Sequence, residues 1–360
     1  MKVGILTFPN SVSYGAVLQM YALQQAVKLL GHDAEVINYH NAYMKQERHC
    51  GGADWKSRAK RMARRMVHSP LYSNFRRFER EEMNLFPAKS FSEAEKLTQV
   101  GRNYQAVICG SDQVWNPDIT NTDLSYFLNF CEAETRRVAY APSFGIEQFS
   151  DGFCQSIQKE LRQFYALSAR EMPGQQLTQK LTGRPVQLVV DPTLLLESDH
   201  WQTMEQPYAA ADGDYILYYT VLSSKTLWKQ ALALSKNTGM KIVVVGGNRL
   251  NKKKMQDVQV EYAVDIGPRQ WLYLVHHARY VVTNSFHGTA FSINYRKDFY
   301  VEFSSKTNSR LAQIVGDLGL TDRVVTEKNI EPAAADYSAA EQTLPTMRQA
   351  SWDYLKQALQ

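Results

Sequence analysis

Short apolar runs alternate with helical stretches along almost the whole chain. "KVGILTF" (residues 2–8) predicts a strand, "GAVLQMYALQQAVKLLG" (15–31) an amphipathic helix, and "AEVINY" (34–39) a second strand. Further strands are expected from the apolar runs at 105–110, 136–143, 166–170 and 186–193. Because parallel strands need a crossover connection, which a helix usually provides, the alternation predicts an α/β fold with parallel sheets.

The pattern restarts after residue 190. "EQPYAAADGD" (205–214) predicts a loop, and strands separated by helices are then expected at 215–220, 241–247, 280–285 and 299–303. A chain of 360 residues, 44% of them hydrophobic, is long enough for more than one core. We therefore expect two Rossmann-like domains that face a cleft, 1–190 and 191–345, and a C-terminal helix at 346–360 that crosses back to the first domain.

Composition indicates a cytoplasmic protein. No run of eighteen apolar residues is present, and the first residues lack the long apolar stretch and cleavage site of a signal peptide. The four cysteines are widely spaced and form no CxxC pair, so we expect free thiols in a reducing compartment and no zinc site built from them: Cys50, Cys109, Cys131 and Cys154.

Positive charge is concentrated in one stretch. Between Lys45 and Arg80, eleven basic side chains stand against three acidic ones, whereas the whole chain carries only +5. Two interpretations stay open: a solvated helix face, or a surface that docks on an anionic membrane or on the diphosphate of a carrier lipid. We expect no nucleic-acid partner, and place the protein in the cytoplasm with peripheral contact to the inner face of the membrane.

Polar turns follow two of the expected strands in the first domain. The turn after residue 8 contains Asn10 and Tyr14 but no GxGxxG, so a dinucleotide fingerprint is absent. The turn after residue 109 crowds hydroxyl, carboxylate, amide and indole groups together, which suits a sugar: Ser111, Asp112, Gln113, Trp115 and Asn116. The alternatives are that these turns only cap helices and that Trp115 is part of the core.

Cationic and small side chains follow other strands. Arg170 comes after the run at 166–170 and can grip an anion in a bidentate way or pair with Glu171. "NSFHG" (284–288) ends the apolar run at 280–283 and starts a helix, whose first turn favours negative charge. There His287 donates to an anion, transfers a proton, or is only a structural histidine. Lys306 and Arg310 lie at the start of a later helix, where cations oppose the helix dipole, so a shared anion would explain them.

Six motifs in order resemble the polysaccharide pyruvyl transferase family, over about residues 1–325. They are "NSVSYGAVLQMYAL" (10–23), "GSDQVWNP" (110–117), "SFG" (143–145), "SARE" (168–171), "DPTLLL" (191–196) and "NSFHG" (284–288). The basic stretch at 45–85 matches poorly and is taken as an insert. Many members have an arginine two positions before the motif histidine, as in Ser-Arg-Leu-His; here that position is Ser285.

The resemblance implies a GT-B-like fold and a transferase for cell-surface glycans, exopolysaccharide or capsule, or for their lipid-linked precursors. It implies that the enolpyruvyl-derived group of phosphoenolpyruvate moves to two sugar hydroxyls, giving a pyruvate ketal and phosphate. His287 and Asp112 are then the candidate acid and base, and no metal or other cofactor is expected. The donor site would use Arg170, Ser285, His287, Gly288, Lys306 and Arg310; the acceptor site would use Asn10, Tyr14, Ser111, Asp112, Gln113, Trp115 and Asn116.

Two other functions stay open on the sequence. A sugar-nucleotide glycosyltransferase would have the same fold, although no glutamate is clearly placed for a ribose after residue 288. A non-catalytic glycan- or membrane-binding protein would explain the serine at position 285.

Overall fold

The computed structural model describes residues 1–47, 69–146, 148–246, 258–303, 308–326 and 330–360. They form two compact units, one of Met1–Leu195 with Met347–Gln360 and one of Leu196–Thr346. "WKSRAKRMARRMVHS" (55–69), which predicts a basic helix, lies almost wholly outside the described residues, as does Lys306.

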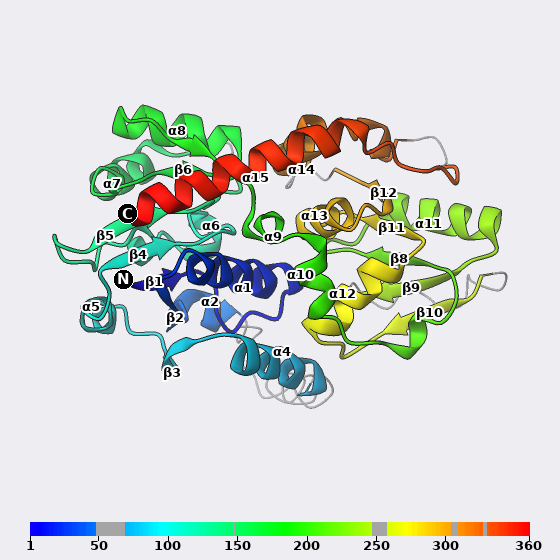
Figure 1. Ribbon diagram of the computed structural model, residues 1–360, viewed down its shortest axis with the longest axis horizontal. Coiled ribbons are helices and arrows are strands. Elements are labelled where there is room, and N and C mark those ends of the chain that lie inside the picture. The colour runs from blue at the N-terminus through cyan, green and yellow to red at the C-terminus, as the bar shows by residue number, and fades with distance from the viewer. Residues whose placement is uncertain (48–68, 147, 247–257, 304–307, 327–329) are drawn as a thin grey trace. The chain divides into compact units, whose positions relative to one another are not determined.

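The first unit is built on a parallel sheet in the order β3-β2-β1-β4-β5 (Figure 1). The strands are β1 (Lys2–Leu6), β2 (Asp33–Tyr39), β3 (Leu85–Phe91), β4 (Ala106–Cys109) and β5 (Arg136–Ala139). A short parallel pair, β6 (Ser168–Ala169) and β7 (Gln187–Leu188), follows. All four residues of β4 are fully buried, so both faces of the sheet are covered, as expected for a parallel sheet whose crossovers are helical.

Helices connect these strands. They are α1 (Tyr14–Leu29), α2 (Ala42–Glu47), α4 (Ser69–Glu82), α5 (Glu95–Gly101), α6 (Pro117–Thr120), α7 (Asp151–Leu161), α8 (Met172–Thr182) and α9 (Pro192–Leu195), with a 3₁₀ turn at Leu124–Phe127. Helix α1 is not the amphipathic surface helix that its sequence suggests, because every residue from Gly15 to Gln24 is buried. Gly31, with φ of 84°, follows the end of this helix in the left-handed conformation that glycine tolerates.

Helix α4 is amphipathic and carries the described end of the basic stretch. Phe75 and Phe78 are buried, with ring centroids 5.0 Å from Tyr14 and 5.8 Å from Tyr21 of α1. Their spacing of three residues puts them on one face. The outer face is basic, with three exposed arginines: Arg76, Arg77 and Arg80.

The second unit repeats the same topology. Its parallel sheet runs β10-β9-β8-β11-β12 (Figure 1), from β8 (Tyr215–Tyr219), β9 (Lys241–Val245), β10 (Val260–Ala263), β11 (Tyr280–Thr283) and β12 (Asp298–Val301). Every residue of β8 and β11 is buried. The helices are α10 (Ser198–Thr203), α11 (Lys225–Thr238), α12 (Pro268–His277), α13 (Phe286–Asn294) and α14 (Asn308–Asp317), with 3₁₀ turns at Ala209–Ala211 and Thr321–Arg323.

The last helix, α15 (Ser338–Leu359), is divided between the units, since its residues from Met347 onward group with the first. There the Tyr354 hydroxyl donates to the carbonyl oxygen of Ala139 at 2.7 Å, and Ser351 Oγ accepts from the backbone N–H of Val190 at 2.9 Å. In the described part of the chain, no helix has the length and apolar character that crossing a membrane requires.

Both sheets have the strand order of a Rossmann-like unit, so the expected α/β fold class is confirmed. In such sheets the connections reverse direction beside the first strand, between β1 and β4 in one unit and between β8 and β11 in the other. Ligands bind beyond the carboxyl ends of the strands at this switch point. These two places therefore define where functional side chains should be sought.

Candidate functional site

Three neighbouring strands of the first unit are each followed by a residue with a left-handed backbone. Asn10 (φ 60°) follows β1, Asp112 (φ 79°) follows β4, and Ala141 (φ 53°) follows β5. A residue other than glycine held in this region costs on the order of 1 kcal/mol or more, and such residues are concentrated at functional sites. The strained turns lie at the carboxyl edge of the sheet, on both sides of its switch point.

A buried charge cluster lies at this edge. Nη1 of Arg170 is 2.7 Å from Oδ2 of Asp191, and Nε is 3.7 Å from Oε2 of Glu171; no side chain of the three is more than 4% exposed. Ser111 Oγ donates to the same oxygen of Asp191 at 2.9 Å. Burial alone would lower the pKa of Arg170, but the surrounding carboxylates, Asp191 above all, raise it. The guanidinium is therefore charged, and acidic groups already offset its charge.

This geometry gives Arg170 a positioning role. Oδ1 of Asp191 accepts from the backbone N–H of Thr193 at 3.0 Å and from its hydroxyl at 2.8 Å, so the ion pair joins the end of β6 to the start of α9. A guanidinium that is 2% exposed and already paired with two carboxylates is poorly suited to hold a phosphate. The ion pairs favour a role for Arg170 in fixing the strand ends, and contact of Arg170 with the donor stays a prediction.

Two residues expected to contact an acceptor are in the core instead. Trp115 is fully buried, stacks on Phe127 with ring centroids 5.2 Å apart, and donates from Nε1 to the carbonyl oxygen of Tyr126. Ser111 is also fully buried and donates to Asp191. Both side chains are without exposed surface, which favours a core role, and acceptor binding by Trp115 and Ser111 stays a prediction.

The other polar residues of this turn are arranged around a glycine. Nδ2 of Asn116 donates to Oε1 of Gln113 at 2.9 Å. A Cβ atom on Gly145, whose φ is 65°, would lie 1.9 Å from that same oxygen, so only glycine leaves room for the amide pair. Oδ1 of Asp112 accepts from the backbone N–H of Gln113 at 2.8 Å, and none of the described residues donates to Oδ2. Asp112 is half-buried, and its second oxygen suits a proton acceptor.

The first turn of the unit is tied to β2 and α4. Nδ2 of Asn10 donates to Oδ1 of Asn38 at 2.8 Å, and its backbone N–H donates to Oε1 of the buried Glu79 at 2.8 Å. Tyr14 packs on Phe75 of α4. Asn10 and Tyr14 both stay partly exposed, so an acceptor role for them remains a prediction.

In the second unit, the "NSFHG" turn lies at the switch point between β8 and β11. Oδ1 of Asn284 accepts from the backbone N–H of Val221 at 3.0 Å, and its Nδ2 donates to the carbonyl oxygen of Leu222 at 2.7 Å. This amide therefore fixes the loop that follows β8. Ser285 caps α13, since its Oγ accepts from the backbone N–H of Gly288 at 3.2 Å.

Close packing holds the start of α13 against the sheet. A Cβ atom on Gly288 would lie 2.5 Å from Oγ1 of Thr283 and 3.0 Å from the ring of Tyr219. Burial raises the pKa of Tyr219 to about 12, against the effect of its hydrogen bond with Ser285. His287, in the first turn of this helix, is 9% exposed. The turn is thus well capped, and it also holds a histidine at a helix N-terminus beyond the end of a central strand.

The remaining predicted donor residues lie on or before α14. Arg310 is the third residue of this helix and is 7% exposed, while Lys306 is outside the described residues. Arg170 belongs to the first unit and His287 and Arg310 to the second, so their convergence on one anion stays a prediction.

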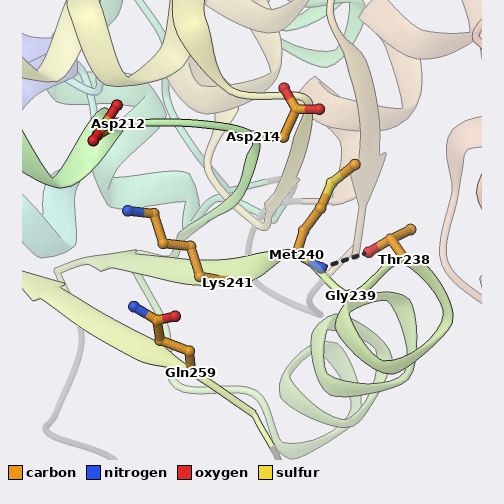
Figure 2. A pocket seen from close by; sticks show the side chains of 7 residues that line it. All are labelled: Asp212, Asp214, Thr238, Gly239, Met240, Lys241 and Gln259. Carbon is orange, nitrogen blue, oxygen red and sulfur yellow. Dashed lines mark hydrogen bonds between the residues drawn. The ribbon is translucent and has the colours of Figure 1, made fainter.

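A separate hollow lies at the opposite edge of the second sheet. It has a volume of about 430 Å³ and includes Asp214, just before β8, and Lys241, the first residue of β9 (Figure 2). These are the amino ends of the strands, whereas parallel α/β sheets bind ligands at the carboxyl ends. The hollow is therefore not the candidate site.

Sequence reasoning missed the residues that organise the site without facing a ligand. Asp191 carries the buried ion pair, Asn284 holds a neighbouring loop, and Asn38 and Glu79 hold the first turn. The signal for Asp191 was present, because an aspartate directly after an apolar run precedes Pro192 and Thr193.

A known protein family matches most of the chain, including these turns. The model of the family described as "Polysaccharide pyruvyl transferase" matches residues 14–301. The chain belongs to this family. The pyruvyl transferase match includes the turn after β4, the buried ion pair and the "NSFHG" turn.

Solved structures support the fold of this pyruvyl transferase family member. The UDP-GlcNAc 2-epimerase of Methanocaldococcus jannaschii matches at 10% identity with a TM-score of 0.51, covering 97% of this chain and 92% of that one. The UDP-GlcNAc 2-epimerase of Neisseria meningitidis matches at 12% identity with a TM-score of 0.50, covering 99% and 94%. At such identities the likeness shows the fold alone, which is GT-B-like. No curated protein matches the chain.

Proposed function

We propose that the protein transfers the enolpyruvyl-derived group of phosphoenolpyruvate to two hydroxyls of one sugar, forming a pyruvate ketal and releasing phosphate. The acceptor is a cell-surface glycan or its lipid-linked precursor. The observation that carries the proposal is the turn after β11, where a capped helix holds His287 in its first turn within the region of the family match. The positive end of the helix dipole favours the phosphate or carboxylate of the donor there.

The chemistry needs one proton donor and one proton acceptor. C3 of the enol gains a proton, C2 becomes an oxocarbenium-like centre, and the first sugar hydroxyl bonds to C2 as it loses its proton. The bond from C2 to the phosphate oxygen then breaks, and the second hydroxyl bonds to C2. The proton of this hydroxyl is taken up by the departing phosphate. Each group that transfers a proton contributes about 10²- to 10⁴-fold to the rate.

His287 and Asp112 take these roles in the proposal. His287 protonates C3 or holds the phosphate, and Asp112 accepts the proton of the attacking hydroxyl. Asp112 suits the second role because it is half-buried and its Oδ2 accepts from none of the described residues. Ser285 stands where many family members have an arginine, and it serves as a helix cap, so Arg310 and Lys306 are the candidates for the missing cation.

The proposal predicts a specific product. Incubation with phosphoenolpyruvate and a candidate lipid-linked sugar should raise the mass of the acceptor by one pyruvyl ketal and release phosphate in equal amount. Turnover of a sugar nucleotide, with phosphoenolpyruvate inert, would instead make the protein a glycosyltransferase. Binding of the sugar without phosphate release from phosphoenolpyruvate would make it a glycan-binding protein.

Attachment to the membrane surface is part of the proposal. The exposed arginines of α4 lie at the end of the basic stretch, and each such charge near an anionic surface contributes about 1 kcal/mol. The protein should sediment with phosphatidylglycerol vesicles at low salt and less at high salt. Reversal of three charges, Arg76→Glu, Arg77→Glu and Arg80→Glu, should weaken this binding.

The matched control reverses three exposed lysines of α11: Lys225→Glu, Lys229→Glu and Lys236→Glu. Equal loss of vesicle binding in both triple variants would show a response to net charge only. No binding of the unaltered protein at low salt would leave the basic stretch as a solvated face.

A further inference from the structure

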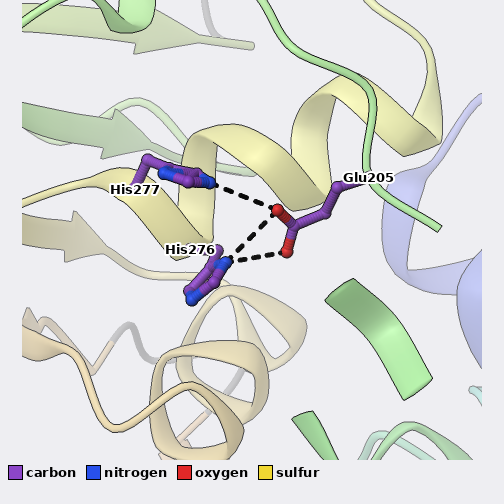
Figure 3. A group of neighbouring side chains, drawn as sticks. All are labelled: Glu205, His276 and His277. Atoms are coloured by element: carbon purple, nitrogen blue, oxygen red, sulfur yellow. Dashed lines mark hydrogen bonds and ion pairs between the residues drawn. The ribbon is translucent and has the colours of Figure 1, made fainter. Parts of the chain in front are cut away.

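Three metal-ligating side chains meet in the second unit, outside the candidate site. Glu205 follows α10, and His276 and His277 are the last two residues of α12 (Figure 3). Nδ1 of His276 lies 2.9 Å from Oε1 of Glu205, and Nε2 of His277 lies 3.3 Å from Oε2. One ligand atom from each of the three lies within 4.8 Å of the other two.

These separations fit a shared ion as well as they fit hydrogen bonds. Two ligands bound tetrahedrally to zinc, each about 2.0–2.1 Å from the metal, are about 3.3 Å apart. The nitrogen–oxygen distances in the cluster lie close to this value. Small shifts of the side chains would therefore admit an ion between them.

The cluster is held in place before any ion binds. The ring of His277 stacks on Tyr273 with centroids 3.9 Å apart, and the ring of His276 stacks on Tyr295 with centroids 4.6 Å apart. Nζ of Lys297 donates to the carbonyl oxygen of His276 at 2.6 Å, which anchors the end of α12. Ordered ligands lose little conformational freedom on binding, and this favours affinity.

The burial of the carboxylate also suits a metal. The side chain of Glu205 is 9% exposed, and a carboxylate in such a place is more stable beside a cation.

We propose that Glu205, His276 and His277 form a site for one divalent transition-metal ion, with zinc the best match. Two imidazoles and one carboxylate are a frequent zinc ligand set, and a water molecule would complete a tetrahedron. The site lies at the amino ends of the strands, since α12 ends at His277 and β11 begins at Tyr280. This is the edge opposite to the "NSFHG" turn, so the ion would join the segment after α10 to α12 rather than act on substrate.

Titration of the metal-free full chain, without an affinity tag, tests the site. Zinc should bind with one ion per chain and raise the melting temperature, because a ligand of the folded state stabilises it. Cobalt(II) in place of zinc should give the visible absorption of a tetrahedral complex. Glu205→Gln keeps the size of the side chain and should weaken zinc binding by about 100-fold or more, since even outer-shell partners contribute 10- to 100-fold.

The matched control is His32→Ala in the first unit, which removes another partly exposed histidine and should leave zinc affinity unchanged. If Glu205→Gln does not fold, His277→Ala provides the second variant, because this side chain is 41% exposed. The proposal would be overturned if Glu205→Gln and His277→Ala bound zinc with the same affinity as the unaltered protein. It would also be overturned if the unaltered protein bound no zinc. The cluster would then be a carboxylate hydrogen-bonded to two imidazoles.

Discussion

Replacement of His287 by alanine should lower kcat of ketal formation by about 10²- to 10⁴-fold while the fold is retained. In the proposed reaction this group protonates C3 or holds the phosphate, and its removal would account for the loss. The fold should be retained, because the hydrogen bonds of Ser285 and Asn284 and the close packing of Gly288 still fix the turn. Initial rates of phosphate release at saturating donor, with a thermal melt of the same sample, measure both effects.

Two further variants give this prediction its controls. His200→Ala removes a partly buried histidine of the same unit and should leave kcat within about twofold, since it lies on α10 and in none of the turns that follow the strands. Asp112→Asn should lower turnover but keep binding of phosphoenolpyruvate. A near-normal kcat for His287→Ala would remove this residue from the chemistry, and loss of donor binding in Asp112→Asn would move that carboxylate to the donor site.

The central strands of both sheets could be predicted from sequence because they are buried on both faces. Strands β1, β4, β8 and β11 are continuous apolar runs, which is the pattern of a parallel strand covered by helices. One edge strand of each sheet, β3 and β10, escaped prediction, whereas the opposite edge strands β5 and β12 coincide with expected strands. Strand β3 contains Pro87 and Lys89, which suit an edge position, and β10 is only four residues long, from Val260 to Ala263.

The polar turns of the candidate site could also be located, because they follow these apolar runs directly. Which side chains face a ligand could not be deduced, since that depends on packing between distant segments. Trp115 is buried by Phe127, Phe144 and Phe164, which come from three later parts of the chain. The cluster of Glu205 with His276 could not be predicted from the sequence for the same reason, because 71 residues separate the two.

Arg170→Met should destabilise the first unit by about 3–5 kcal/mol. The substitution removes the cation of a fully buried pair and leaves the Asp191 carboxylate without it, beside Glu171. Urea unfolding followed by circular dichroism should show the transition at a lower denaturant concentration. Arg102→Met is the matched control, because its ion pair with Glu132 is exposed at 63% and 46% and should change stability by at most about 1 kcal/mol.

A second variant separates the positioning role of Arg170 from contact with the donor. Adding Asp191→Asn to Arg170→Met removes the charge that was left unpaired, so part of the lost stability should return. If Arg170 only positions the strand ends, the double variant should regain affinity for phosphoenolpyruvate together with stability. The opposite result would be an Arg170→Met protein that keeps normal stability but binds phosphoenolpyruvate at least tenfold more weakly. This result would show that the guanidinium contacts the donor. The buried ion pair would then be the arrangement of the donor-free protein, and it would open when the donor binds.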